Sequence, residues 1–214
     1  MAMNQEKYCM NQIICQNKIK YLVSDINQTA DVIGCELDIQ KIFIPNSIQH
    51  ESKKYNVISI LKSCFEGSKL KSIEFSKESK IRIIKEKAFF KTSIESITIP
   101  NEVRIIGKNA FSCCEKLQQI EFSNDSKLQT IEEEAFFRTS IESIIIPDKV
   151  SIIGKNAFSC CEKLQRIEFS NQSKLQTIED GAFCGTSIES ITIPSEVIDL
   201  KEGWCHDTNK LIRV

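Results

Sequence analysis

Apolar and polar residues follow one short pattern along most of the chain. In residues 94–99, isoleucine stands at the first, fourth and sixth positions, and the polar residues Glu95, Ser96 and Thr98 stand between them. Alternation of this kind predicts a β-strand with one buried side and one solvent-facing side. β-Branched residues dominate the apolar positions, which also favours a strand. No apolar stripe with a 3.6-residue period is long enough to predict an ordinary helix.

The pattern belongs to an internal repeat. Residues 94–140 and 141–187 are identical at 37 of 47 positions. Within these blocks, Ala-Phe dipeptides come at spacings that alternate between 22 and 25 residues, so the structural unit is about half a block. In one kind of unit, which we name the proline coil, proline follows the strand (Pro45, Pro100, Pro147, Pro194). In the other kind, the serine coil, serine stands at that place (Ser76, Ser123, Ser170).

The units form one continuous array of seven coils and the start of an eighth. They begin at Ile39, Leu70, Ile94, Leu117, Ile141, Leu164, Ile188 and Leu211. A unit of 23 to 24 residues is too small to bury its own apolar face, so stacked neighbours must share a core. The sequence therefore predicts a β-rich solenoid, a leucine-rich-repeat array with a parallel sheet on one face and short 3₁₀ or extended segments on the outer side.

Proline and phenylalanine fit this array. Proline lacks the N–H that a strand ladder needs, so it should end each strand of a proline coil. One phenylalanine per coil should stack on the next at the strand spacing of about 4.8 Å, as a core spine rather than a cofactor site. The spine residues are Phe65, Phe89, Phe111, Phe136, Phe158 and Phe183.

The motif L-x-x-I-x-I-P-x-x-V-x-x-I-G-x-x-A-F-x-x-C, met at 94–114 and 141–161, resembles the BspA-type leucine-rich repeats of treponemal and Bacteroidetes-type surface proteins. The serine coil is most similar to members from mucosal protozoan parasites of the trichomonad type. The resemblance covers residues 39–214. It implies a right-handed curved solenoid, with the parallel sheet on its concave face, that binds proteins in surface adhesion.

The two ends of the array differ from its middle. Residues 20–36 resemble the hairpin that often caps such arrays, so we divide the chain into a tail (1–18), a capping hairpin (19–38) and the repeat array (39–214). The last full unit departs from the motif, with Leu200 at the glycine position and Trp204 near the phenylalanine position. We expect it to be a degenerate closing coil.

Charge and hydropathy narrow the class of partner. The chain has 28 basic and 29 acidic residues, and this balance does not favour binding to nucleic acid. No apolar run approaches the length of about 18 residues that spans a membrane. The N-terminus has no apolar segment after a basic start, so we expect no signal peptide. The cell surface or secretion, which the resemblance implies, and the cytoplasm both stay open as locations.

Ten cysteines raise the question of metal or redox chemistry. The pairs Cys113-Cys114 and Cys160-Cys161 occupy the same place in two proline coils. Cys114 and Cys161 should be buried and two coils apart, about 9.6 Å, which is too far for a disulfide between them. A zinc site needs four converging ligands. We therefore favour buried, reduced thiols over a redox or metal site.

No catalytic motif accompanies the repeat. The chain contains neither G-x-S-x-G nor H-E-x-x-H, and it has no glycine-rich phosphate loop. We expect no catalytic centre, no cofactor and no metal. Gly107 and Gly154 are interpreted as tight corners of the coil. His206, next to Cys205, is interpreted as part of the closing coil rather than as the base of a nucleophile.

The outward positions of the repeat strands form the candidate binding face. Six glutamates stand there on a regular lattice, with two apolar residues among them. This face is either a solvated, solubilising surface or a mildly acidic concave surface that binds a protein. The candidate partner-binding residues are Phe43, Glu74, Glu95, Thr98, Glu121, Glu142, Ile145, Glu168, Glu189 and Thr192.

These observations predict a non-enzymatic protein-binding module. Its partner would be a host protein in surface adhesion, or an intracellular protein if the chain acts as a scaffold. Residues 211–214 match the start of a further strand, and an open strand edge predicts weak end-to-end self-association. Asn27, Asn124 and Asn171 begin N-x-S/T sequons, whose use would require secretion.

Overall fold

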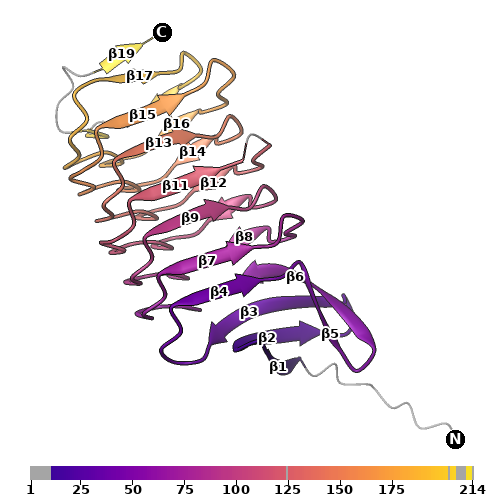
Figure 1. Cartoon of the computed structure of the whole chain (residues 1–214). Helices are drawn as coiled ribbons and strands as arrows, with labels where there is room; N and C mark the ends of the chain where they lie inside the picture. The colour runs from indigo at the N-terminus through magenta and orange to yellow at the C-terminus, as the bar shows by residue number, and fades with distance from the viewer. Residues whose placement is uncertain (1–10, 124, 202, 206–210, 214) are drawn as a thin grey trace, which may run out of the picture.

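The structure is a computed structural model that describes residues 11–123, 125–201, 203–205 and 211–213. The chain forms a β-solenoid in which successive coils stack along one axis, with a group of antiparallel strands at the N-terminal end (Figure 1). Each full coil contributes one strand to each of two parallel layers. Within the described ranges there is neither an α-helix nor a 3₁₀-helix. The predicted parallel-sheet solenoid is confirmed, and the predicted 3₁₀ segments are not found there.

The first layer, which we call the long-strand sheet, is built from the I-x-x-I-x-I segments. Ile97 and Ile99 are 3% and 1% exposed, whereas Ser96 and Thr98, which alternate with them, are exposed, as the pattern predicts. The strands are β4 (Lys41–Ile44), β7 (Ser72–Phe75), β9 (Ser96–Ile99), β11 (Gln119–Phe122), β13 (Ser143–Ile146), β15 (Arg166–Phe169), β17 (Ile191–Ile193) and β19 (Leu211–Arg213).

The second layer, the short-strand sheet, holds the V/L-x-x-I segments. Its two-residue strands pair in parallel from coil to coil, so the outer side is extended, as predicted, and is itself a continuous sheet. The pattern did not reveal this continuity because two-residue strands are too short to show alternation. The strands are β8 (Ile83–Ile84), β10 (Ile105–Ile106), β12 (Thr130–Ile131), β14 (Ile152–Ile153), β16 (Thr177–Ile178) and β18 (Asp199–Leu200).

The N-terminal cap extends the short-strand sheet. β2 (Ile19–Ser24) and β3 (Thr29–Cys35) form an antiparallel hairpin within the predicted range 19–38. β3 then pairs in parallel with β6 (Lys53–Ile60), which forms its own hairpin with β5 (Ser47–His50). β1 (Gln12–Gln16) lies in the segment that we expected to be a tail. It is a strand because it pairs along its whole length with β2 and buries Ile14 against the core.

The predicted phenylalanine spine is confirmed. The six rings stack from coil to coil with centroid distances of 4.9 to 5.5 Å. The Trp204 ring meets Phe183 edge-on at 6.1 Å. The backbone of Trp204 occupies the alanine position, because its carbonyl accepts the Phe183 N–H at 2.9 Å as the Ala182 carbonyl accepts the Phe158 N–H at 2.8 Å. In the closing coil, the Trp204 ring therefore lies edge-on to Phe183 instead of stacking parallel to it.

Two glycine assignments need correction. β18 pairs Leu200 with Ile178, so Leu200 continues the isoleucine row and Lys201 stands at the glycine position. Gly107 and Gly154 are required by close contact between coils rather than by a corner of left-handed backbone. A Cβ on Gly154 would lie 2.8 Å from the backbone of Glu132 and Glu133 in the preceding coil.

In the described part of the chain, no helix is long and apolar enough to cross a lipid bilayer.

Candidate binding surface

Seven of the ten predicted face residues lie in strands of the long-strand sheet, and the other three, Glu95, Glu142 and Glu189, lie one or two residues before a strand. Nine of the ten are exposed, including the apolar side chains Phe43 (53%) and Ile145 (63%). Glu168 is half-buried, because the Arg166 guanidinium lies 2.6 Å from its carboxylate on the same strand. The strand pairs place Phe43 beside Glu74 and Ile145 beside Glu168. The face therefore mixes acidic with apolar groups.

The acidic groups repeat with a period of two coils. Between β9 and β17, five glutamates and one arginine occupy the outward positions, and that arginine is already paired with Glu168. Thr98 separates Glu121 from Glu74 and donates a hydrogen bond to Glu121 at 3.3 Å. Two coils correspond to about 9.6 Å, which weakens the repulsion between successive carboxylates. The two rows are Glu74, Glu121 and Glu168, and Glu95, Glu142 and Glu189.

The long-strand sheet is not uniform, because its strands pair fully only at alternate steps. From a proline coil to the following serine coil, as from β9 to β11, four residues pair in register. From a serine coil to the following proline coil, β7 and β9 share only the Ser72–Ser96 pair, and β11 and β13 belong to separate sheets.

Proline explains part of this difference. The Ser76 N–H donates to the Ile44 carbonyl at 3.0 Å across a full step. Pro100, at the same place one coil later, has no N–H to donate to the coil before it.

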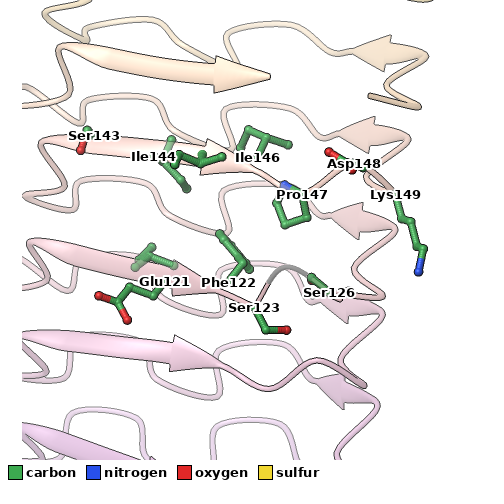
Figure 2. Close-up of a pocket in the computed structure, with 12 residues that line it drawn as sticks. Glu121, Phe122, Ser123, Ser126, Ser143, Ile144, Ile146, Pro147, Asp148 and Lys149 are labelled. Carbon is green, nitrogen blue, oxygen red and sulfur yellow. The ribbon is translucent and has the colours of Figure 1, made fainter. Parts of the chain in front are cut away.

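Two of the weak steps carry a groove, and we call these two the seam grooves. One has a volume of about 540 Å³ and lies between β11 and β13, where Glu121 and Ile145 border it on the outward side. Figure 2 shows Phe122 at the end of β11, facing Pro147 of the next coil. The second, of about 420 Å³, lies between β7 and β9 beside Phe75 and Pro100.

The sequence contained a signal for these grooves that the pattern analysis missed. The last strand residue alternates between buried isoleucine in proline coils (Ile99, Ile146) and half-buried phenylalanine in serine coils (Phe75, Phe122, Phe169). A phenylalanine that is not fully buried at every second coil marks an imperfectly closed step. The prolines, which we interpreted only as strand ends, mark the other wall of the same step.

The doubled cysteine pairs belong to the architecture. Cys114 and Cys161 are fully buried, as predicted, and burial raises the pKa of each thiol to about 11. The Cys161 Sγ donates to the Phe136 carbonyl at 3.0 Å, and Thr139 donates to that same carbonyl at 3.0 Å. Cys113 is only partly buried. Each pair thus holds one thiol in the core and one near the surface.

The histidines and the sequon asparagines, which were also considered as functional groups, do not form a site with one another in the part of the chain that the structure describes. Among the described residues, no set of three or more His, Cys, Asp or Glu side chains could hold a metal ion. His50 lies 3.3 Å from the Gln12 amide in the cap, and His206 lies outside the described residues. Asn27 and Asn171 are exposed in turns, and Asn124 also lies outside the described residues.

Comparisons with known proteins agree with this architecture. The model of the BspA-type leucine-rich repeat region matches residues 36–137 and 82–212, with six copies. No curated protein sequence is close enough to count as a match.

Solved structures show the same fold. A leucine-rich repeat protein from Bacteroides ovatus is similar over 88% of this chain and 52% of its own, with 26% identity and a TM-score of 0.73. One from Eubacterium ventriosum is similar over 92% of this chain and 51% of its own, with 17% identity and a TM-score of 0.71. This chain spans about half the length of these two proteins.

The leucine-rich repeat fold is typical of protein-interaction modules and is typically non-enzymatic. The array of alternating coils, the stacked phenylalanine spine and the match of the family model over residues 36–212 lead to one conclusion. The chain belongs to the BspA-type leucine-rich repeat proteins.

Proposed function

We propose that this protein is a non-enzymatic module that recognises another protein through the outward side of its long-strand sheet, in adhesion to host proteins. The observation that carries the proposal is the face itself. Acidic rows and exposed apolar side chains share one side of an array whose stacked coils form a single core. Solenoid sheets of this kind present extended binding surfaces.

Phe43 and Ile145 are the natural anchors of such a contact. Each is an exposed large apolar side chain beside a glutamate, so a partner can bury it and also place a cation next to it. Apolar anchors that become fully desolvated supply most of the free energy of binding at protein interfaces. We expect the partner to present basic residues around an apolar centre.

A pull-down from host-cell extract tests the proposal. The variant Glu121→Lys/Glu168→Lys reverses two charges of one row, and we expect it to lose the captured partner. The control Glu115→Lys/Glu162→Lys makes the same charge change at two exposed turn positions, also two coils apart, and should retain capture. Equal capture by both variants would argue against the face.

A second candidate function is an intracellular scaffold of the same fold. The observation that favours it is that all nine described cysteines are free, which is usual in a reducing compartment. Surface biotinylation of intact cells separates the two candidates. Labelling of this protein, with a cytosolic marker unlabelled, supports adhesion, and absence of labelling supports the scaffold.

We also propose weak end-to-end self-association through residues 211–214. β19 pairs with β17 on one side, and Val214 lies outside the described residues. A further strand could add to the other edge of β19 through backbone hydrogen bonds. Light scattering should show a mass that rises with concentration, and a constant monomer mass at high concentration would contradict this proposal.

A further inference from the structure

We propose that the seam grooves and the neighbouring glutamate row bind a basic, proline-rich segment in the polyproline II conformation. The segment lies along the solenoid axis, across the strands, and places every third side chain in a successive groove. This inference rests on the proposed function and names the partner class of the same face.

The first step of the argument is spacing. The grooves recur once in two coils, because Phe75 and Phe122 occupy the same place two coils apart. Two strand spacings are about 9.6 Å. Three residues of a polyproline II helix make one full turn and rise about 9.3 Å, so equivalent side chains meet successive grooves in register.

Other regular conformations do not match this repeat. In a β-strand, residues that face the same side recur at about 6.8 Å. In an α-helix, two turns rise about 10.8 Å, about 1.2 Å more than the groove spacing. Polyproline II, with a mismatch of about 0.3 Å, therefore fits the groove spacing best.

The second step is the chemistry of the groove walls. One groove has the Phe122 ring on one side and the Pro147 ring on the other (Figure 2). The other has Phe75 and Pro100 at the same places. Shallow sites lined by aromatic and apolar rings are those that bind proline-rich segments, whose conformation is already fixed and therefore loses little entropy on binding.

The third step is charge. Glu121 lines one groove and Glu74 lines the other, so a carboxylate recurs at the grooves with the same two-coil period. A polyproline II segment has three edges. With one edge in the grooves, a second edge lies over the glutamate row, where lysine or arginine side chains would pair with it. The third edge faces solvent, so any residue can stand there.

The register of the peptide gives a direct test. The probe is a synthetic peptide of about twelve residues with the repeat Pro-Pro-Lys, which at about 3.1 Å per residue is long enough to cover both grooves. The controls have the repeat Pro-Pro-Pro-Lys, whose period is about 12.4 Å, and the repeat Val-Lys, which favours strands. We expect saturable binding of the first peptide by titration calorimetry and binding at least about tenfold weaker for both controls.

Two tryptophan variants locate the site. Ser123 is exposed and lines both grooves, so Ser123→Trp should fill them and abolish binding of the Pro-Pro-Lys peptide. Gln118, exposed just before the same strand and outside both grooves, provides the control Gln118→Trp, which should bind as the unmodified protein does. Circular dichroism confirms that both variants fold.

The outcomes separate this inference from the proposed function. Equal binding of the three peptides, or equal loss in both tryptophan variants, overturns the inference. If no peptide binds while the pull-down still depends on Glu121 and Glu168, the face recognises a protein of another conformation, and only this inference fails. If neither the peptides nor the extract shows dependence on the face, both proposals fail.

Discussion

Proline and serine coils place different residues at one equivalent core position, and both residues donate a hydrogen bond to a buried carbonyl. The core site that holds Cys114 and Cys161 in proline coils holds Thr92 and Thr139 in serine coils, and each cysteine Sγ lies 3.2 to 3.3 Å from the threonine hydroxyl of the preceding coil. Thiol and hydroxyl alike satisfy a buried carbonyl there. The repeated cysteines, which raised the question of a metal or redox site, therefore fill the same core position in two coils.

The buried thiols predict how stability depends on pH. Their pKa is about 11 in the folded protein against an ordinary value of 9.0, so the thiols stay protonated in the fold after they ionise in the unfolded chain. Their contribution is complete below about pH 9 and is lost as pH rises to about 11, by about 1.4 kcal/mol per pH unit for each thiol.

Denaturant unfolding between pH 8 and pH 11 measures this loss. The variant Cys114→Thr/Cys161→Thr copies the serine-coil residue, which does not ionise in this range, and should lose much less stability over the same interval. Parallel pH profiles for the two proteins would contradict the assignment.

Gly154 carries a second prediction at this scale. Its missing side chain lets the coil approach the backbone of Glu132 and Glu133, so Gly154→Ala should lower the free energy of unfolding by about 2 to 3 kcal/mol. Lys85 stands at the position equivalent to Gly107 in a serine coil, and Lys85→Ala should change stability by less than about 0.5 kcal/mol. Thermal unfolding of both variants tests whether close contact between coils requires glycine at position 154. Equal losses of stability in the two variants would contradict this explanation.

At the scale of elements, the sequence predicted the strands of the long-strand sheet and the spine well. Alternation over six residues reports a buried side directly, as at Ile97 and Ile99. The short-strand sheet and β1 were missed as sheet elements, because two-residue strands and a mostly exposed edge strand show little alternation. The seam grooves were missed because they depend on pairing between coils, which a single coil does not encode.

The spine predicts a gradient of sensitivity among the phenylalanines. Phe111 is fully buried between two stacked rings, so Phe111→Ala should cost about 3 to 5 kcal/mol. Phe122 is half-buried at a groove, and Phe122→Ala should cost less than half as much, because less apolar surface leaves the core. Guanidinium unfolding that ranks the two variants in the opposite order would contradict the assignment of spine and groove.

At the scale of the whole molecule, the alternation of coils predicts which deletions are tolerated. Removal of residues 94–140 takes out one proline coil and one serine coil and joins the same sequence that precedes Ile141 in the natural chain, Thr-Ser. The shortened array should fold cooperatively with lower stability, since repeat arrays behave as sums of neighbour interactions.

Removal of residues 94–116 alone should be more damaging, although fewer residues are lost. It would stack one serine coil directly on another, placing Glu121 beside Glu74 and Phe122 beside Phe75. Like charges directly opposite each other on neighbouring strands destabilise a sheet. Circular dichroism melts of the two deletions provide the comparison, and a more stable single-coil deletion would contradict the two-coil unit.

The central claim is that recognition takes place on the outward side of the long-strand sheet. Carbodiimide labelling of carboxylates, read by mass spectrometry with and without the captured partner, tests it most directly. The account predicts that Glu95, Glu121 and Glu142 become protected while Glu115 and Glu162, on the turns, label as before. Protection of the turn glutamates with the sheet glutamates unchanged would contradict it.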